Sequence, residues 1–446
     1  MVDVREANLT LDLCLRLGEV LLSSGAGAAD VVATMMSVSR QYGLRSPDID
    51  ITFTSLSMSY VHTPEDSPLT HTRQVNQRTI DYEHLTQVDH LVRDVLADRV
   101  DVGDARSALA RITSSGHVTP RWAVSIGWGL MCSGIGLMLG GDLWVVAIAF
   151  VAAVVIDRMQ LTMSRRRLPY FYQQVAGGAV ATVIAAAARA TGLDVDPSLV
   201  VTANIVMLLA GIGFMGALQD ALSGFYVTAG ARLTEAVLAT AGIIAGVSGG
   251  LSVAAVAGVE IGRLDPGAGD LKGLGVMAAG GALAAAAFAF ASYAPKRILL
   301  PIGLIAAAAM VISQTIALQM LGNVWSVALA AFFVGLVSYT VSARLRVPPL
   351  VVVVSAVVPM LPGLSIYRGL ALLAEGDGTT SRGLLAMITA ASIAIALSSG
   401  VILGEYVAQP LKREARRLEG RLSGPRLVGP VRMHSSRRSR RTSADA

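Results

Sequence analysis

Apolar residues divide this chain of 446 residues into two parts. Up to about residue 115 they recur at helical or alternating spacing among polar residues, and after Pro120 they form long runs with few charges. Several of these runs approach the ~20 residues that an α-helix needs to cross a ~30 Å hydrocarbon core. The pattern therefore predicts a polytopic α-helical membrane protein that is preceded by a small α+β domain.

The first part is predicted to hold two helices, two strands and two further helices. Small residues at positions 23–27 separate the first two helices, and turn-forming residues at 64–68 separate the two strands. No signal peptide is recognised before this domain. The predicted helices lie around residues 13–21, 28–35, 85–96 and 104–112, and the strands at 49–61 and 68–77.

After Pro120 the apolar runs predict ten transmembrane spans, and the loop charges predict their orientation. The spans lie at about residues 122–139, 143–156, 175–191, 199–218, 236–259, 274–293, 298–318, 324–343, 350–373 and 384–406. The loops on one side carry Arg158, Arg165, Arg166, Arg167, Lys296, Arg297, Arg344, Arg346, Lys412, Arg413, Arg416 and Arg417. The other side carries Asp142, Asp194, Asp196, Glu260, Asp265, Asp270, Glu375 and Asp377. By the positive-inside rule, both termini and the N-terminal domain are cytoplasmic.

The ninth span is broken in its middle. Residues 349–382 begin as an apolar run, which then meets Pro359, Pro362 and Gly363. Proline removes a backbone donor and clashes with the preceding turn, so this helix must open or kink. Within a bilayer the freed carbonyls are tolerated only where they are buried in protein or line a water-filled cavity. With Tyr367 and Arg368 just beyond it, the break is a candidate site.

An earlier segment matches this broken one and predicts an internal repeat. Pro197 falls on Pro349 and Gly211 on Gly363, and after a two-residue shift Arg232 falls on Arg382. Chance matching among Ala, Val and Gly is the alternative, but the spacing, the prolines and the arginines favour a repeat. The predicted units are residues 1–118, a cytoplasmic domain; 119–268 and 269–410, two five-helix repeats; and 411–446, a basic, disordered tail.

Five crossings in each unit mean that the second repeat is inverted relative to the first. The predicted fold is therefore ten transmembrane helices in two inverted five-helix repeats. Inverted repeats with a substrate site near the bilayer midplane, built from discontinuous helices, are typical of secondary transporters. The organisation predicts a transporter.

Composition and motif context argue against several other classes of function. The net charge of +5 comes mostly from membrane-flanking loops and the tail, so it predicts no nucleic-acid binding. Two cysteines, Cys14 and Cys132, give neither a disulfide framework nor a metal cluster. Gly211, Gly213 and Gly216 spell GxGxxG inside an apolar helix, where close helix packing explains them better than a dinucleotide cofactor does.

Histidines of the N-terminal domain do not follow a metal-binding motif. None of those at positions 62, 71, 84 and 90 has the spacing of HExxH or of a Cys/His finger. We interpret them as solvent-facing or core histidines and predict no metal site. Ser24 and Ser55 lack a nucleophile elbow, so hydrolase activity is a minor alternative.

Five motifs resemble the bacterial threonine/serine exporter family, and the resemblance covers nearly the whole chain. They are the LLSSGA start at 21–26, TFTS at 52–55, TRQVNQRTIDY at 72–82, the run at 210–235 and PMLPGLSIYRGL at 359–370. The resemblance implies a cytoplasmic N-terminal domain, ten membrane helices in a bacterial cytoplasmic (inner) membrane, and export of threonine and serine driven by the proton motive force. The basic tail after about Leu422 lies outside it and is predicted to contact anionic lipid.

A zwitterionic substrate needs a partner for each of its charges where water is scarce. Half-helix N-termini can face the carboxylate, and unwound carbonyls or a carboxylate can hold the ammonium. The predicted substrate-binding residues are Asn204, Gly211, Gly213, Ser355, Pro359, Pro362, Gly363, Tyr367 and Arg368. The predicted coupling or gating residues are Asp220, Arg232, Glu235 and Arg382. Snorkelling at the interface is an alternative role for Arg232 and Arg368.

Two other classes of function stay open. The chain can export another small solute, or it can be a membrane-anchored enzyme or sensor with its chemistry in residues 1–118. The pattern does not predict an oligomeric state or identify the coupling ion.

Overall fold

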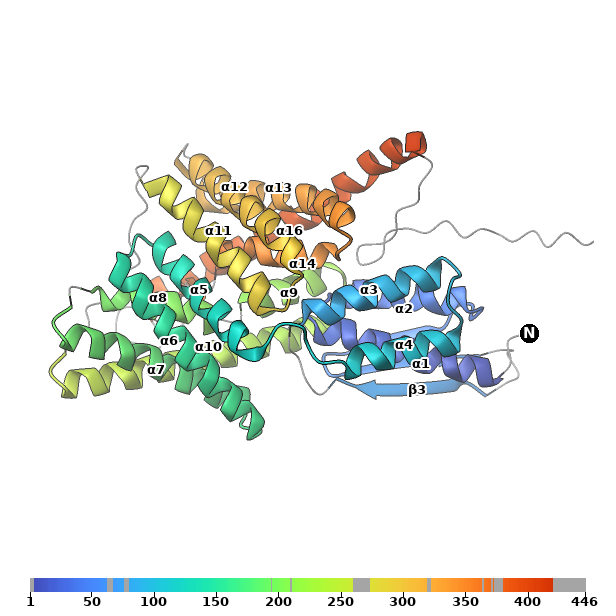
Figure 1. The fold of residues 1–446 in the computed structure, drawn as a ribbon, viewed down its shortest axis with the longest axis horizontal. Helices are drawn as coiled ribbons and strands as arrows, with labels where there is room; N and C mark the ends of the chain where they lie inside the picture. Colours follow the sequence, from blue (N-terminus) through green and yellow to red (C-terminus); the bar gives the residue numbers. More distant parts are fainter. Residues whose placement is uncertain are drawn as a thin grey trace, which may run out of the picture.

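The computed structural model describes residues 4–61, 67–75, 80–193, 195–208, 211–259, 273–318, 322–362, 365–369, 372 and 380–419. Two regions lie end to end along the long axis of the molecule (Figure 1). The helices and strands before residue 115 occupy one end, and the helices from α5 onward occupy the other. Side chains are described up to residue 408.

The N-terminal region packs four helices with a three-stranded antiparallel sheet in the order β1-β2-β3. Leu56 and Met58 of the central strand are fully buried. Residues Asp81 and Asp101 cap the last two helices, because each carboxylate accepts a hydrogen bond from a backbone N–H three residues later. The elements are α1 (Val4–Ser23), α2 (Ala28–Gln41), β1 (Asp48–Ile51), β2 (Ser55–Tyr60), β3 (Leu69–Gln74), α3 (Tyr82–Leu96) and α4 (Val102–Ser114).

The prediction of a single strand over residues 49–61 is wrong. The chain turns back after Ile51, where the Thr52 N–H donates to the Ser55 carbonyl at 2.9 Å, and Ile51 then pairs with Leu56. The stretch therefore forms two strands of a hairpin. The apolar positions change at the turn from odd numbers (Ile49, Ile51, Phe53) to even numbers (Leu56, Met58, Tyr60), a phase shift that the single-strand prediction overlooked.

The second region consists of helices, and within its described residues seven helices are long and apolar enough to cross a membrane by length and composition. The count becomes eight if α8 and α9, which bend by 45° at their junction, form one broken span. The chain is therefore a polytopic membrane protein, and ten crossings stay a prediction. The helices are α5 (Arg121–Met138), α6 (Leu143–Arg165), α7 (Tyr170–Ala190), α8 (Pro197–Leu208), α9 (Gly211–Leu222), α10 (Tyr226–Val256), α11 (Leu274–Ala291), η2 (Lys296–Ile298), α12 (Leu299–Leu318), α13 (Gly322–Leu345), α14 (Pro349–Val357), η3 (Val358–Met360) and α16 (Thr380–Glu419).

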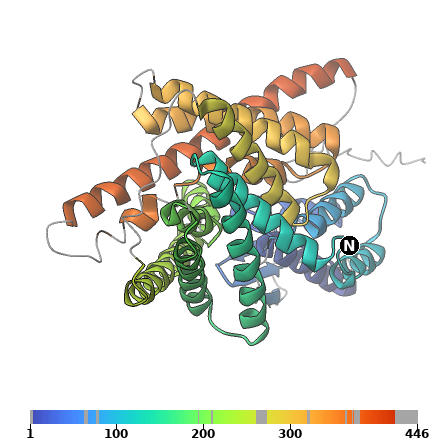
Figure 2. The ribbon, with the colours of Figure 1, turned by 60° about the vertical axis from the view of Figure 1, so that its left-hand side comes forward.

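These helices fall into two groups with the same pattern of neighbours. In the first, α5 packs on α6, α6 on α7, and α7 on both α8 and α10; in the second, α11 packs on α12, α12 on α13, and α13 on both α14 and α16. The groups lie against each other, green beside yellow to red in Figure 2, with α5 and α11 in close contact between them.

Glycines allow α5 and α11 to approach closely, and the contacts of these glycines show how the two helices run relative to each other. A Cβ at Gly134 would lie 2.7 Å from the Gly280 carbonyl oxygen, and one at Gly280 would lie 2.6 Å from the Gly134 carbonyl oxygen. Near the start of α5, Gly127 faces Ala291, the last residue of α11. The two helices are therefore antiparallel, and their contact is reciprocal.

Candidate functional site

The predicted break after α14 is present. Helix α14 ends at Val357, one 3-10 turn follows, and Leu361 is extended with ψ of 138°. Helical structure resumes at residue 365, and the Ile366 N–H donates to the Pro362 carbonyl at 3.0 Å. Gly363 lies outside the described residues. Proline rings at 359 and 362 explain the break because neither can donate to the preceding turn.

Side chains around this break are buried. Ser355, Pro359, Pro362 and Tyr367 are buried, and Arg368 is half-buried. A Cβ at Gly281 of α11 would meet Pro359 at 3.8 Å, so the 3-10 turn packs on α11. The break thus lies inside the helical region, where the uncapped carbonyls of a broken helix can meet a polar ligand.

The break of α14 and the bend between α8 and α9 are neighbours in space. Phe214, just after the bend, and Ile366, just after the break, belong to one buried cluster that also includes α10 and α16. Tyr367 belongs to a second buried cluster with Leu208, the last residue of α8. The two discontinuous helices therefore meet in the interior.

The predicted polar contacts differ in how well they are satisfied. Asn204 of α8 is fully buried, and its Nδ2 donates to the Val200 carbonyl at 2.9 Å. Within the described part of the chain, its Oδ1 accepts no hydrogen bond. Gly211 begins α9, and Gly213 follows in its first turn. Asn204 is thus a buried amide with spare acceptor capacity next to the bend.

Asp220 and Arg232 form a buried pair that holds the N-terminal region. Arg232 Nη1 lies 3.1 Å from Asp220 Oδ2, and the two side chains are 7% and 1% exposed. Asp220 Oδ1 accepts from the Ala28 N–H at 2.8 Å, and Arg232 Nη2 donates to the Ala26 carbonyl at 3.0 Å. The pair therefore binds one backbone N–H and one backbone carbonyl of the α1–α2 turn.

The turn is shaped for this contact. Gly25 has φ of +91°, a conformation that favours glycine, and the Ala26 N–H donates back to the Leu21 carbonyl at 3.0 Å. On the membrane side, a Cβ at Gly216 would lie 2.7 Å from Arg232 Nη1. These glycines explain part of the LLSSGA motif and of GxGxxG as packing against the buried pair.

Within the described part of the chain, the other two predicted coupling residues form no ion pair with Asp220 or Arg232, although the charge of Glu235 acts on Arg232 at longer range. Glu235 of α10 and Arg382 of α16 are exposed. Sequence reasoning missed Asp157 of α6, a buried carboxylate that accepts from Arg121 Nη2 and from Ser125 Oγ, both at 2.6 Å. Its only signal was an aspartate at the end of an apolar run.

Tyr82 is a second residue that sequence reasoning missed. It begins α3 in the N-terminal region and is 1% exposed, and its N–H donates to the Ser292 carbonyl at 2.9 Å. Its ring meets Phe288 of α11 edge-on, with centroids 6.3 Å apart, and its hydroxyl meets Ser355 of α14. Burial raises the pKa of the Tyr82 hydroxyl, which therefore stays protonated. The N-terminal region thus reaches a predicted substrate-binding residue.

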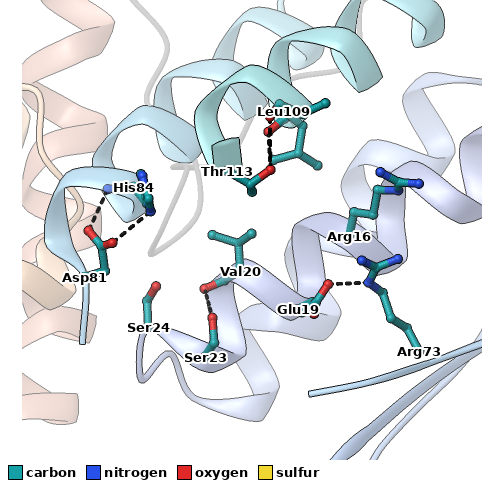
Figure 3. A pocket seen from close by; sticks show the side chains of 11 residues that line it. Arg16, Glu19, Val20, Ser23, Ser24, Arg73, Asp81, His84, Leu109 and Thr113 are labelled. Carbon is teal, nitrogen blue, oxygen red and sulfur yellow. Dashed lines mark hydrogen bonds and ion pairs between the residues drawn. The ribbon is translucent and has the colours of Figure 1, made fainter. Parts of the chain in front are cut away.

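The N-terminal region also holds a cavity of about 430 Å³ (Figure 3). Its wall carries Arg16, Ser24, Asp81, His84 and an ion pair of Arg73 with Glu19. Among the described residues, Ser24 makes no hydrogen bond with His84, so no nucleophile and base pair is formed there. One group with metal-ligating atoms, formed by Asp81, His84 and His117, borders this cavity.

Comparison with known proteins gives two family matches that cover most of the chain. A model described as "Putative threonine/serine exporter" matches residues 12–254, and one described as "Threonine/Serine exporter, ThrE" matches residues 277–407. No solved structure matches the chain.

Three named relatives extend this comparison. A "Probable threonine/serine exporter" of Mycobacterium tuberculosis is 36% identical over 96% of this chain and 83% of its own length. A "Threonine/serine exporter" of Corynebacterium glutamicum is 31% identical over 93% of this chain and 86% of its own length. A "Probable succinate transporter subunit YjjP" of Klebsiella aerogenes is 25% identical over 55% of this chain and 94% of its own length.

Proposed function

This chain belongs to the threonine/serine exporter family, and on that premise we propose that it exports threonine and serine from the cytoplasm, driven by the proton motive force. Membership of this family points to a transporter rather than an enzyme. The protein acts in the bacterial cytoplasmic (inner) membrane with both termini inside. Its partners are a small amino acid, protons and the lipid bilayer.

The substrate pathway runs where the two discontinuous helices meet. The observation that carries this proposal is the shared burial of Phe214 and Ile366, each of which directly follows a helix interruption. The N-terminal N–H groups of α9, from Gly211 onward, bind the substrate carboxylate, because a helix N-terminus carries a partial positive charge. Carbonyls freed beside Pro359 and the open acceptor of Asn204 bind the ammonium.

Two sets of contacts support an inverted repeat. The first is the contact of α5 with α11, the first helices of the two groups, which Gly134 and Gly280 allow to approach closely. Because α5 and α11 are antiparallel, an axis that relates them is perpendicular to both and lies in the membrane plane. Phe214 and Ile366, which share a cluster, also differ by the offset that pairs Gly211 with Gly363.

Contacts of the N-terminal region support the proposed orientation. It contacts the helices at the α9–α10 turn through Asp220, at the α11–α12 turn through Ser292, and at the α13–α14 turn through Arg346, whose carbonyl is 2.9 Å from His90 Nε2. The ten-span topology puts these three turns on one side of the membrane. That side is the basic, cytoplasmic one.

Counterflow into proteoliposomes tests the substrate class. Separate vesicles are loaded with unlabelled threonine, serine, glycine or succinate, and uptake of the same solute in labelled form is measured. Threonine and serine are expected to exchange, and glycine to exchange more slowly because it lacks the hydroxyl. Exchange of succinate alone would instead support a second candidate substrate, a small dicarboxylate. The similarity of part of the chain to the succinate transporter subunit is the observation that favours this candidate.

A further inference from the structure

Three side chains from two distant segments converge beside the cavity of the N-terminal region. Asp81 caps α3, His84 lies in its first turn, and His117 lies in the connector between α4 and α5. Asp81 Oδ2 is 2.8 Å from His84 Nδ1 and 2.7 Å from His117 Nε2. One atom of each residue lies within 4.8 Å of the others.

We propose that Asp81 Oδ2, His84 Nδ1 and His117 Nε2 bind one divalent transition-metal ion of the Zn²⁺ class. Two imidazoles and a carboxylate form a ligand set that suits Zn²⁺ and its first-row neighbours and disfavours Mg²⁺ and Ca²⁺, which prefer oxygen ligands. Bonds of about 2.0–2.2 Å around a tetrahedral ion separate ligand atoms by about 3.3–3.6 Å. The two carboxylate–imidazole separations, 2.8 and 2.7 Å, are shorter than this, and all three atoms lie within 4.8 Å of one another, so side-chain adjustments would admit the ion.

The ligands are already oriented by other contacts. Asp81 Oδ1 accepts from the His84 N–H at 3.0 Å, which turns Oδ2 toward both imidazoles. The His117 ring stacks on Tyr293 with centroids 3.9 Å apart, and Tyr293 has φ of +62° just after α11. Such a conformation in a non-glycine residue persists only where its surroundings impose it. Positioning of this kind is typical of metal sites, whose outer contacts fix the ligands.

A fourth coordination position faces the cavity. Asp81 and His84 form one end of its wall (Figure 3). Their side chains are 13% and 16% exposed, and that of His117 is 29% exposed, so an ion can enter from solvent. Three protein ligands leave room for water or for a small solute in the cavity, as in zinc sites that keep an open position.

The bound ion links the N-terminal region to the membrane helices. The ligand Asp81 directly precedes Tyr82, which is inserted between Phe288 and Ser355. Bound metal therefore joins the start of α3 to the connector that leads into α5, next to the point where Tyr82 meets α14. The competing explanation is a hydrogen-bonded Asp and His cluster that binds no metal.

Metal titration of the full-length protein tests this site. The protein is purified in detergent with an affinity tag free of histidine, stripped with a chelator, and titrated with Zn²⁺ by calorimetry and with Co²⁺ by visible absorption. Wild type is expected to bind one ion, with intense Co²⁺ bands in the visible that indicate tetrahedral coordination. Asp81→Asn and His117→Gln remove one ligand each, and asparagine still caps α3.

Each ligand variant is expected to weaken binding by on the order of a hundredfold or more, because loss of even an outer-shell partner costs about 10- to 100-fold. His90→Gln, which changes another histidine of α3, is the control and is expected to bind as wild type does. A wild-type protein that binds no Zn²⁺ at micromolar concentration overturns the proposal. So does equal binding by wild type and His117→Gln, which would place the ion elsewhere.

Discussion

Replacement of Arg232 by methionine is expected to release the α1–α2 turn from the membrane helices. Arg232→Met keeps a long apolar stem but removes the counter-charge of Asp220, which is 1% exposed, and the donor to the Ala26 carbonyl. Removing one partner of a buried ion pair costs about 3–5 kcal/mol. If about 3 kcal/mol of this acts on the turn, its opening increases about a hundredfold, since each 1.4 kcal/mol is tenfold.

Amide hydrogen exchange measures this opening directly. In lipid nanodiscs, peptides that cover residues 24–31 are expected to exchange about a hundredfold faster in Arg232→Met than in wild type, while peptides from α13 keep their rates. Glu235→Gln is the matched control, because it changes an exposed charge on the same helix. Unchanged exchange at the turn in a folded Arg232→Met protein would refute the assignment of this pair as the attachment of the N-terminal region.

The double variant separates charge from packing. Asp220→Asn combined with Arg232→Met removes both buried charges, so neither remains without its counter-charge. Its destabilisation is expected to be smaller than the sum of the two single variants, with a coupling in the range of about 0.5–3 kcal/mol that contacting residues show. Strict additivity would mean that the two side chains act independently despite their 3.1 Å separation.

Three further predictions address the break, the helix contact and pH. Pro359→Ala with Pro362→Ala should keep or raise stability, because each interior proline costs a helix about 3 kcal/mol, while threonine export falls steeply; export at the wild-type rate would make the break a packing feature. Gly134→Ala should lower the thermal midpoint by an amount equivalent to about 1–3 kcal/mol, because its Cβ would meet the α11 backbone, whereas Gly249→Ala, which meets no atom within 4 Å, should not. Burial raises the pKa of Asp89 to about 7 in the folded state, above about 3.9 in the unfolded state. The buried charge therefore lowers the stability of the fold fully above pH 7, and this loss fades as the pH falls toward 4. Asp89→Asn should be more stable than wild type by up to about 4 kcal/mol at pH 8 and about equally stable at pH 4.

Much of the helical framework follows from local pattern. Long apolar runs predicted the membrane helices because a spanning helix must be apolar along its whole length, and the prolines at 359 and 362 predicted the break for a steric reason. The hairpin at residues 48–60 was not predicted, although the apolar alternation shifts by one position between Phe53 and Leu56, where the Thr52 N–H donates to the Ser55 carbonyl.

The contacts between regions lay beyond local pattern. Asp220 and Arg232 were singled out as charges near the hydrocarbon, but their partners Ala26 and Ala28 lie about two hundred residues earlier and are bound through backbone atoms, which leave no residue signature. Tyr82 was noted only as the end of the TRQVNQRTIDY motif, because its contact with Phe288 of α11 leaves no local signal. His117 lies 36 residues from Asp81, at a spacing that no short metal motif uses.

The most direct test of the central claim is efflux of preloaded threonine from proteoliposomes that contain the purified protein. An imposed proton gradient, with protons concentrated on the side that receives the threonine, is expected to accelerate efflux, and an ionophore that collapses the gradient should return it to the slower passive rate. With or without the gradient, the Pro359→Ala and Pro362→Ala double variant should show threonine efflux no faster than that from protein-free vesicles. Threonine efflux from wild-type vesicles no faster than from protein-free vesicles, with or without the gradient, would contradict the account.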